Sequence, residues 1–268
     1  MSFFDKLEQR IADAHSLLCV GLDPEMAKLP AGVSMAEFNR AIVVATQDLV
    51  CAYKLNFAFY EAAGTLGWGA LEETLKCIPP DIPVIADAKR ADIGNTSRAY
   101  ASAIFDGLKF DAVTVNPYLG FDSVAPFLEY RDRGVFVLCR TSNPGAADFQ
   151  SLPVTSDGCP APLYEIVAKK ASQWNEHGNI GLVVGATGAV ELSLLRHKHP
   201  DLPFLVPGVG AQGGDLALVM RDGQSSSPAG LIVNASRQII FASSGRDFAN
   251  DAARAAQALR DEINRYRR

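Results

Sequence analysis

Short runs of apolar and often β-branched residues recur along this chain of 268 residues. A short apolar run bounded by turn residues is typical of a buried strand. The eight runs are LLCVGL (17–22), LVCAYKL (49–55), PVIAD (83–87), DAVTVN (111–116), GVFVLC (134–139), IGLVVGA (180–186), PFLVPG (203–208) and GLIVNA (230–235). Because the runs are apolar throughout and do not alternate with polar residues, we expect both faces of each strand to be buried.

Segments of helical character separate most of these runs. They include residues 35–49, 97–109, 163–178, 215–223 and 248–268. Strands that alternate with helices indicate a parallel sheet, and eight such units favour a (β/α)8 TIM barrel over an open doubly wound sheet. The pattern therefore predicts an α/β fold in which residues 1–268 form a single barrel domain.

Two segments lie outside the eight repeating units. Residues 1–16 carry acidic and basic residues at helical spacing and predict an N-terminal helix. Residues 143–162, rich in Pro, Gly and Ser, predict a long irregular loop after the fifth strand. A loop of this length in a compact domain is usually functional or mobile.

The carboxyl ends of the strands are where a barrel of this kind places its chemistry. The polar residues expected there are Asp23, Lys54, Asn56, Asp87, Lys89, Asn116, Thr141, Ser142, the turn PGVGAQGG (207–214), and residues 234–237. Side chains at positions i and i+2 of a strand share one face, so Asp87 and Lys89 point the same way if their strand continues through Lys89. Lys54 lies near the end of the neighbouring strand, so its side chain can reach the same end of the barrel.

These opposed charges have a structural and a functional interpretation. Lysines and carboxylates that satisfy one another can simply close the end of a barrel, since structural ion pairs also perturb pKa values. Here, however, three strand ends supply opposed charges at the face where barrels build their sites. We therefore favour the functional interpretation.

The turn GVGAQG (208–213) formally matches the dinucleotide motif GxGxxG. That motif also needs an acidic residue about 20 positions later, whereas the next strand ends at Asn234. Glycines that let backbone N–H groups approach an anion, followed by a helix, predict a phosphate site instead. Gln212 lies in this turn, and Arg237 follows the last strand, where it can clamp the phosphate.

Composition narrows the classes of function. The net charge of −5 argues against a nucleic-acid partner. All four histidines precede the first strand or lie in helix-to-strand connections, so neither a histidine metal site nor a Ser–His–Asp triad is expected. Five scattered cysteines and the absence of a long apolar run predict a cytoplasmic protein without a membrane partner.

The segment DAKRADIGNT (87–96) resembles the DxKxxDI-x-x-T signature of the orotidine 5′-phosphate decarboxylase family. The resemblance covers most of the chain and includes GLDP (21–24), AYKLNFAFYE (52–61), TSNPGA (141–146), PGVGAQGGD (207–215) and NASRQII (234–240). KLNFAF, NPYLG and the long segment after the fifth strand are similar to the longer bacterial branch. The residues of 147–163 have no counterpart that we can assign in the family pattern.

The resemblance implies decarboxylation of orotidine 5′-phosphate to uridine 5′-phosphate by a homodimer, without a metal or organic cofactor. It implies a charged tetrad of Lys54, Asp87, Lys89 and Asp92, in which Asp92 reaches the partner subunit's site. The nucleotide substrate would be bound by Asp23, Lys54, Asn56, Ile93, Thr96, Ser142, Pro207, Gln212, Ser236 and Arg237. The ribose would be bound by Asp23, Lys54 and the partner's Thr96. The pyrimidine would be bound by Ser142, and the phosphate by Gln212 and Arg237.

Three alternatives remain open at this stage. A related barrel enzyme acting on a sugar phosphate shares the DxKxxD motif, but generally needs Mg²⁺ and a further strand-end acid. An imine-forming aldolase would use Lys54 or Lys89, although flanking carboxylates keep a lysine protonated. A non-catalytic nucleotide-binding relative would keep the pocket without the reaction.

Overall fold

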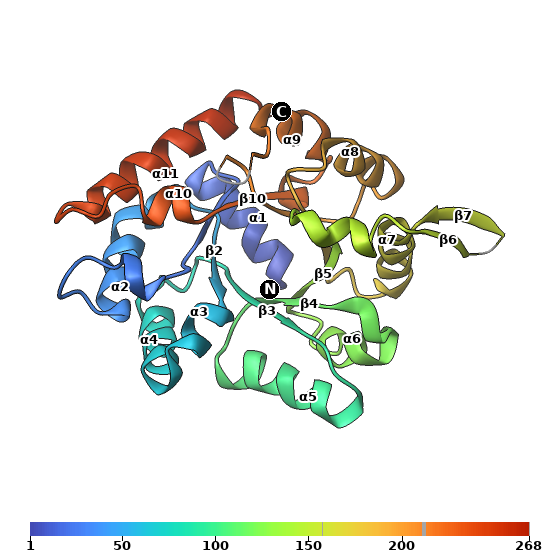
Figure 1. The fold of residues 1–268 in the computed structure, drawn as a ribbon, viewed down its shortest axis with the longest axis horizontal. Coiled ribbons are helices and arrows are strands. Elements are labelled where there is room, and N and C mark those ends of the chain that lie inside the picture. The colour runs from blue at the N-terminus through green and yellow to red at the C-terminus, as the bar shows by residue number, and fades with distance from the viewer. Residues whose placement is uncertain (157, 211–212, 268) are drawn as a thin grey trace.

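The computed structural model describes residues 1–156, 158–210 and 213–267. Among these residues, eight parallel strands close into a barrel, and helices surround it (Figure 1). The strands of the barrel are β1 (Leu18–Gly21), β2 (Ala52–Asn56), β3 (Val84–Arg90), β4 (Ala112–Val115), β5 (Gly134–Arg140), β8 (Ile180–Val184), β9 (Phe204–Pro207) and β10 (Leu231–Ala235). The predicted barrel and all eight predicted strands are confirmed, and β3 runs three residues beyond its apolar run.

One helix precedes β1, and further helices lie between and after the strands of the barrel. They are α1 (Phe3–Ala14), α2 (Met35–Thr46), α3 (Phe57–Ala62), α4 (Gly64–Cys77), α5 (Gly94–Ser102), α6 (Phe121–Leu128), α7 (Leu163–Trp174), α8 (Ala189–Lys198), α9 (Leu216–Gly223), α10 (Arg237–Ile240) and α11 (Phe248–Arg265). None of the helices in the described part of the chain is long and apolar enough to cross a membrane.

The predicted N-terminal helix is α1, and its sequence explains its start and its packing. Ser2 and Asp5 form a capping box, in which each side chain binds the other's backbone N–H. The buried face of α1 carries Phe3, Leu7 and Ile11. The Phe3 ring packs beside Gly134 at the start of β5, so α1 covers the amino-terminal end of the barrel. The opposite end, where the strands finish, stays open.

The segment after β5 is more ordered than the predicted irregular loop. It holds a short 3₁₀ helix (Pro144–Asp148) and the antiparallel pair β6 (Pro153–Ser156) and β7 (Cys159–Pro162), which project from the barrel beside α7 (Figure 1). Gly158 has a φ of +79°, a conformation that glycine adopts without strain in a tight turn. The predicted long connection after β5 is present, but part of it is a regular hairpin, because proline and glycine mark a hairpin as readily as an irregular loop.

The core lies inside the barrel and between its strands and the helices. Its largest fully buried side chains include Tyr53, Tyr60, Phe38, Phe105 and Phe136. Cys19, Cys51 and Cys139 are buried and free, as expected for cysteines in apolar strands. This packed interior fixes the strand ends that carry the polar side chains.

Candidate active site

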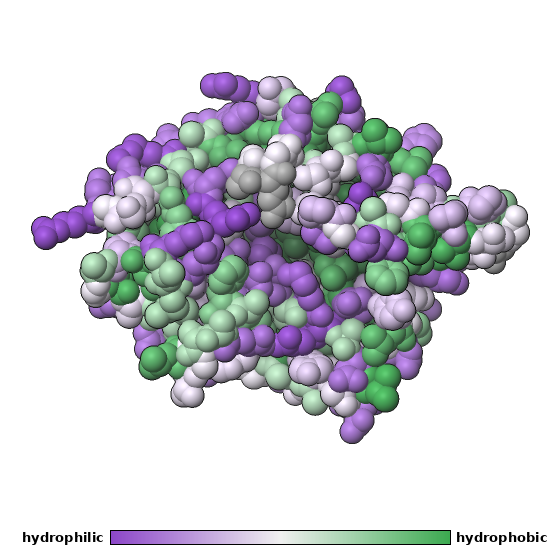
Figure 2. All heavy atoms as spheres, in the orientation of Figure 1, coloured by the Kyte–Doolittle hydropathy of each residue, from purple (hydrophilic) through white to green (hydrophobic). Residues whose placement is uncertain are grey.

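A cavity of about 460 Å³ opens at the carboxyl ends of the strands. Figure 2 shows a hollow at the centre of this face, where hydrophilic side chains gather. Every strand of the barrel, or the residues directly after it, contributes to the lining. The lining residues are Asp23, Lys54, Asn56, Asp87, Lys89, Thr114, Leu138, Thr141, Ser142, Asn143, Val183, Leu205, Pro207, Gly208, Val209, Asn234, Ala235, Ser236, Arg237 and Gln238.

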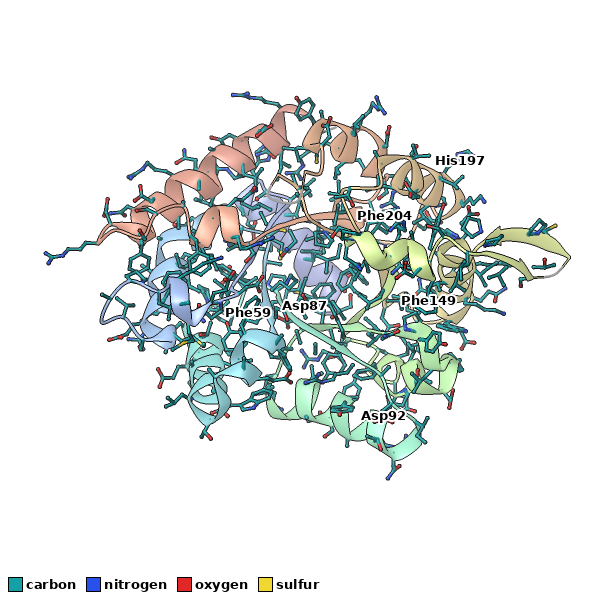
Figure 3. All side chains as sticks on the ribbon, viewed as in Figure 1. Phe59, Asp87, Asp92, Phe149, His197 and Phe204 are labelled. Atoms are coloured by element: carbon teal, nitrogen blue, oxygen red, sulfur yellow. The ribbon has the colours of Figure 1, made fainter. Side chains whose placement is uncertain are left out.

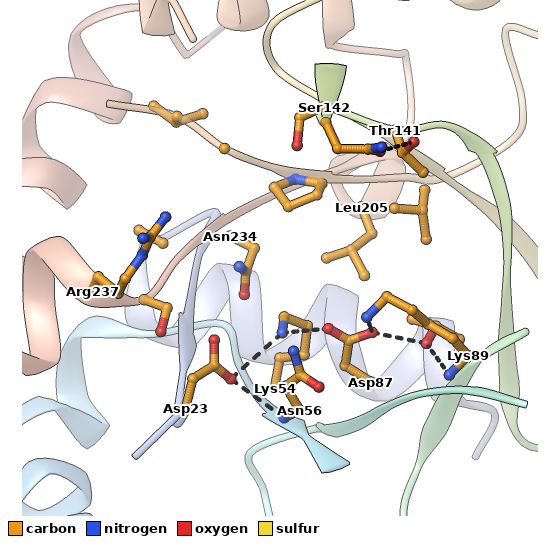
Figure 4. A pocket seen from close by; sticks show the side chains of 18 of the residues that line it. Asp23, Lys54, Asn56, Asp87, Lys89, Thr141, Ser142, Leu205, Asn234 and Arg237 are labelled. Carbon is orange, nitrogen blue, oxygen red and sulfur yellow. Dashed lines mark hydrogen bonds and ion pairs between the residues drawn. The ribbon is translucent and has the colours of Figure 1, made fainter. Parts of the chain in front are cut away.

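Asp87 lies at the centre of the charged groups in this cavity (Figure 4). Its Oδ2 lies 2.8 Å from the Nζ of Lys54, and its Oδ1 lies 2.5 Å from the Nζ of Lys89. The Nζ of Lys54 is also 3.8 Å from Oδ1 of Asp23. The predicted cluster of opposed charges therefore forms within a single chain.

The charge state of this cluster follows from its neighbours. Burial alone raises the pKa of Asp87, but Lys54 and Lys89 outweigh burial and hold this pKa well below its usual range. Burial alone lowers the pKa of Lys54, yet Asp23 and Asp87 raise it above its usual value. At neutral pH the site therefore holds a buried ammonium and a buried carboxylate, both charged.

Lys89 differs from Lys54 in its exposure. The side chain of Lys54 is 5% exposed, whereas that of Lys89 is 47% exposed. Lys54 is thus fixed in the barrel interior, and Lys89 stands at the mouth of the cavity, where a ligand can meet its ammonium.

Asp23 and Asn56 lie side by side at the ends of neighbouring strands. The Oδ1 of Asp23 accepts a hydrogen bond from the backbone N–H of Asn56 at 3.3 Å. The Oδ1 of Asn56 accepts one from the N–H of Ala58 and so caps α3. Both side chains line the cavity, as predicted.

Arg237 lies on the side of the cavity opposite to Lys89 (Figure 4). Pro207, Gly208 and Val209 at the end of β9, together with Ser236, line the cavity beside it. Gly208 and Gly210 have φ values of +95° and +72°, so the glycine turn uses conformations that other residues rarely adopt. Gln212, which we predicted to bind phosphate, lies outside the described residues.

Ser142 lies where the ends of β5 and β8 meet. A Cβ added at Gly185 would lie 2.7 Å from the backbone nitrogen of Ser142, so a glycine lets the two chains approach. Ser142 lines the cavity as predicted, together with Thr141 and Asn143.

Three predicted site residues do not line this cavity. Asp92, Ile93 and Thr96 lie at the start of α5, and Figure 3 shows Asp92 well away from Asp87. The Oδ1 of Asp92 accepts a hydrogen bond from the N–H of Ile93, and the Ile93 side chain is 63% exposed. Within one chain, the predicted tetrad is therefore a cluster of Lys54, Asp87 and Lys89 without Asp92.

The strand pattern missed several cavity residues. Thr114, Leu138, Val183 and Leu205 line it from the strand interiors, and Asn234 was noted at a strand end but given no role. The Oδ1 of Asn234 is buried and has no hydrogen-bond partner among the described residues. A polar residue inside an apolar strand, such as the threonine of DAVTVN, was the signal that could have found Thr114.

The polar side chains of the cavity indicate which kind of ligand it can hold. Among residues 1–156, 158–210 and 213–267, no group of three or more His, Cys, Asp or Glu side chains is placed to hold a metal ion. His197 lies in α8 on the outside of the barrel (Figure 3). The site instead combines ammonium groups, carboxylates and a guanidinium, which suits a polar, anionic ligand.

Comparisons with known proteins identify a family and relatives that this chain resembles along most of its length. The family model of the orotidine 5′-phosphate decarboxylase / HUMPS family matches residues 16–252. Orotidine 5′-phosphate decarboxylases of Dehalococcoides mccartyi and Thermomicrobium roseum are 55% and 53% identical, covering 100% of this chain and 99% and 97% of their own lengths. The structure of Leishmania donovani OMP decarboxylase superposes with a TM-score of 0.87 at 43% identity, with 99% of each chain covered.

Proposed function

This chain belongs to the orotidine 5′-phosphate decarboxylase / HUMPS family, and we propose that Lys89, Asp87 and Lys54 carry the chemistry of its reaction. The reaction is the decarboxylation of orotidine 5′-phosphate to uridine 5′-phosphate in pyrimidine nucleotide synthesis, so the protein is a carboxy-lyase. The observation that supports the roles most directly is Lys89 Nζ, held 2.5 Å from Asp87 Oδ1 at the cavity mouth.

The reaction breaks the bond between C6 of the pyrimidine and its carboxylate carbon. The electron pair of that bond stays on C6 as CO₂ leaves. An ammonium fixed beside C6 stabilises the developing negative charge and then donates a proton to C6, and we assign both roles to Lys89. Lys89 regains its proton from solvent.

Asp87 and Lys54 prepare this step. Asp87 aims the Lys89 side chain, because its Oδ1 lies 2.5 Å from the Lys89 Nζ. Lys54 holds the other oxygen of Asp87 and neutralises part of its charge. The Asp87 carboxylate would face the departing carboxylate of the substrate, and the two negative charges would repel each other before CO₂ leaves.

Arg237 supplies the binding site for the phosphate in this proposal. It lies across the cavity from Lys89 (Figure 4), and Gly208 of the glycine turn lines the same cavity. A guanidinium can bind a phosphate through two parallel hydrogen bonds. Because this contact is remote from C6, its binding energy can position the pyrimidine against Lys89. Asp23 and Lys54 then lie between the two ends, where the ribose would pass.

We also propose that the enzyme is a homodimer in which Asp92, Ile93 and Thr96 act in the partner's site. Two observations support this. In their own chain these residues do not line the cavity, and exposed apolar residues follow the ends of β3 and β4, among them Ile93, Tyr118 and Phe121. Exposed apolar groups that cluster near a functional site mark a contact surface.

Two further expectations concern the setting of the reaction. The reaction needs no metal or organic cofactor, because Lys89 supplies both the charge and the proton.

The enzyme works in the cytoplasm, which fits its five free cysteines. Cell fractionation with an antibody against the chain tests the location.

A sugar-phosphate enzyme of the same family remains the second candidate for the site. Such an enzyme would need a further acid in the cavity. The first acid after β2 is Glu61, which forms an ion pair with Arg90 and does not line the cavity. The described residues therefore fit the nucleotide reaction better.

The decisive experiment is a decarboxylation assay with orotidine 5′-phosphate before and after exhaustive chelation. Unchanged turnover after chelation supports the proposed mechanism. Turnover that is lost and then restored by Mg²⁺ contradicts the mechanism, and the absence of any turnover of orotidine 5′-phosphate would favour the second candidate.

A further inference from the structure

The end of β3 is not a regular strand. Against β4, Ala86 pairs with Val113 and Arg90 pairs with Val115. Three residues of β3, from Asp87 to Lys89, therefore stand opposite the single residue Thr114 of β4. This is a bulge, which re-aims side chains and often lies next to an active site. Asp87 and Lys89 still face the same cavity, as expected, but the strand that carries them is bulged rather than regular.

The bulge places Lys89 in an unusual backbone conformation. Its φ is +49°, in the left-handed region that a residue with a long side chain rarely adopts. Such a residue persists only when the surrounding structure holds it in place. The backbone N–H of Lys89 donates a hydrogen bond of 3.0 Å to the Oγ1 of Thr114, and this contact crosses from β3 to β4.

The same hydroxyl also binds the catalytic carboxylate. The Oγ1 of Thr114 donates to Oδ1 of Asp87 at 2.9 Å, and that oxygen is the one that Lys89 Nζ contacts. Thr114 is 1% exposed, so water does not readily replace it. The buried hydroxyl of Thr114 thus accepts a hydrogen bond from the backbone N–H of Lys89 and donates one to the carboxylate that the Lys89 side chain contacts.

We propose that Thr114 is a positioning residue that fixes the Lys89 ammonium and the Asp87 carboxylate relative to each other. The inference rests on the proposed role of Lys89 as proton donor. Thr114 acts by closing a ring of three contacts, from Lys89 N to Thr114 Oγ1, to Asp87 Oδ1, and back to Lys89 Nζ. Asp87 is consequently held from two sides, by Lys54 at one oxygen and by Thr114 at the other.

Thr114→Val is the direct test, because valine has the shape of threonine without its hydroxyl. The variant leaves the Lys89 N–H without its acceptor and lets the Asp87 carboxylate turn. Since hydrogen bonds to charged groups are the stronger ones, we expect kcat to fall about 10- to 100-fold. The affinity for uridine 5′-phosphate should stay within about threefold, because the phosphate contacts at Arg237 are untouched.

Two further variants separate positioning from stability. Thr114→Ser keeps the hydroxyl and should restore kcat to within about threefold of wild type. Thr46→Val is the matched control: the hydroxyl of Thr46 is also buried, and it contacts Tyr53 and Ile42, which do not line the cavity. This control should lower the melting temperature while leaving kcat unchanged.

The outcomes are distinct. If Thr114→Val keeps kcat within twofold of wild type, or if serine restores no more activity than valine, the inference is overturned. If the valine variant does not fold, Thr114→Ala replaces it in the same comparison. A wild-type protein without decarboxylase activity would contradict the proposed function itself, whereas an active wild type with an indifferent Thr114→Val contradicts only the role of Thr114.

Discussion

Lys54 and Asp87 form a buried ion pair, with the Nζ of Lys54 2.8 Å from the Oδ2 of Asp87. The two side chains are 5% and 11% exposed. A buried charge is costly without its partner, and here each partner also has a second contact, Asp23 for Lys54 and Lys89 for Asp87. The pair therefore gives the site a fixed charge distribution before any ligand binds.

The first prediction concerns the pH dependence of stability. The pKa of Asp87 is lowered in the folded state by Lys54 and Lys89 against the effect of burial. A carboxyl group whose pKa is lower in the folded state stabilises the folded protein at pH values above its unfolded-state pKa of about 3.9. This contribution is lost as the pH falls through the folded-state pKa. The difference in unfolding free energy between wild type and Asp87→Asn should be constant from pH 8 to about 5, and it should shrink below about pH 4.

Urea denaturation at several pH values measures this difference. Glu176→Gln, at an exposed site after α7, is the control and should show no comparable change. A difference that stays constant below about pH 4 as well would mean that folding does not lower the pKa of Asp87, and it would contradict the prediction.

The second prediction concerns Lys89. Lys89→Ala removes the proposed proton donor, and general acid catalysis contributes about 100-fold or more, so kcat should fall at least 100-fold. Calorimetry should still detect binding of uridine 5′-phosphate, because the phosphate site is intact. Lys76→Ala, on the exposed face of α4, is the control. A variant that keeps more than about a tenth of wild-type kcat rules Lys89 out as the donor.

The third prediction concerns Arg237. Arg237→Ala should lower kcat/KM for orotidine 5′-phosphate on the order of 10- to 100-fold, because it removes a charged hydrogen-bond donor. The same change should hardly affect the much slower reaction of orotidine, which has no phosphate. Arg246→Ala, at an exposed position, should leave both substrates unaffected. Equal losses for the two substrates would assign Arg237 to the fold rather than to phosphate binding.

The fourth prediction concerns the partner subunit. Lys89→Ala and Asp92→Ala should each be inactive alone, and mixing them under conditions that exchange subunits should restore activity. In a hybrid dimer that shares its sites, one site carries both changes and the other carries neither. An equal mixture should therefore recover about a quarter of wild-type activity, since about half of the dimers are hybrids with one intact site.

Subunit exchange must be verified in the same experiment. Mass spectrometry of differently tagged chains counts the hybrids, and blocking exchange should prevent recovery. Confirmed hybrid dimers without activity would mean that Asp92 does not act in the partner's site.

The fifth prediction concerns stability outside the site. Arg196 of α8 is 8% exposed and donates to the carbonyls of Gly223, Leu202 and Gly230 at 2.9, 2.7 and 2.7 Å. Arg196→Ala leaves these carbonyls without that donor and should lower the free energy of unfolding by about 2–4 kcal/mol. Urea denaturation measures the loss. Arg98→Ala, which breaks an exposed ion pair with Glu129, should change stability by less than about 1 kcal/mol.

The sequence determined the barrel and the edge at which its site lies. Runs such as DAVTVN and GLIVNA are apolar throughout, so their strands had to be buried on both faces, and their positions match β4 and β10. Charges at the ends of such strands had to meet at one rim. The strand ends therefore predicted that Lys54, Asp87, Lys89 and Arg237 line one cavity, as they do.

Only the tertiary structure decided how those neighbours contact one another. The bulge opposite Thr114 depends on how β3 pairs with β4, and residues 86–90 do not encode that register by themselves. The hairpin of β6 and β7 arose where composition had indicated an irregular loop. The position of Asp92, away from Asp87 in its own chain, likewise follows from the direction in which α5 leaves the barrel. Apolar periodicity specifies local structure, whereas contacts between strands depend on residues that are distant in sequence.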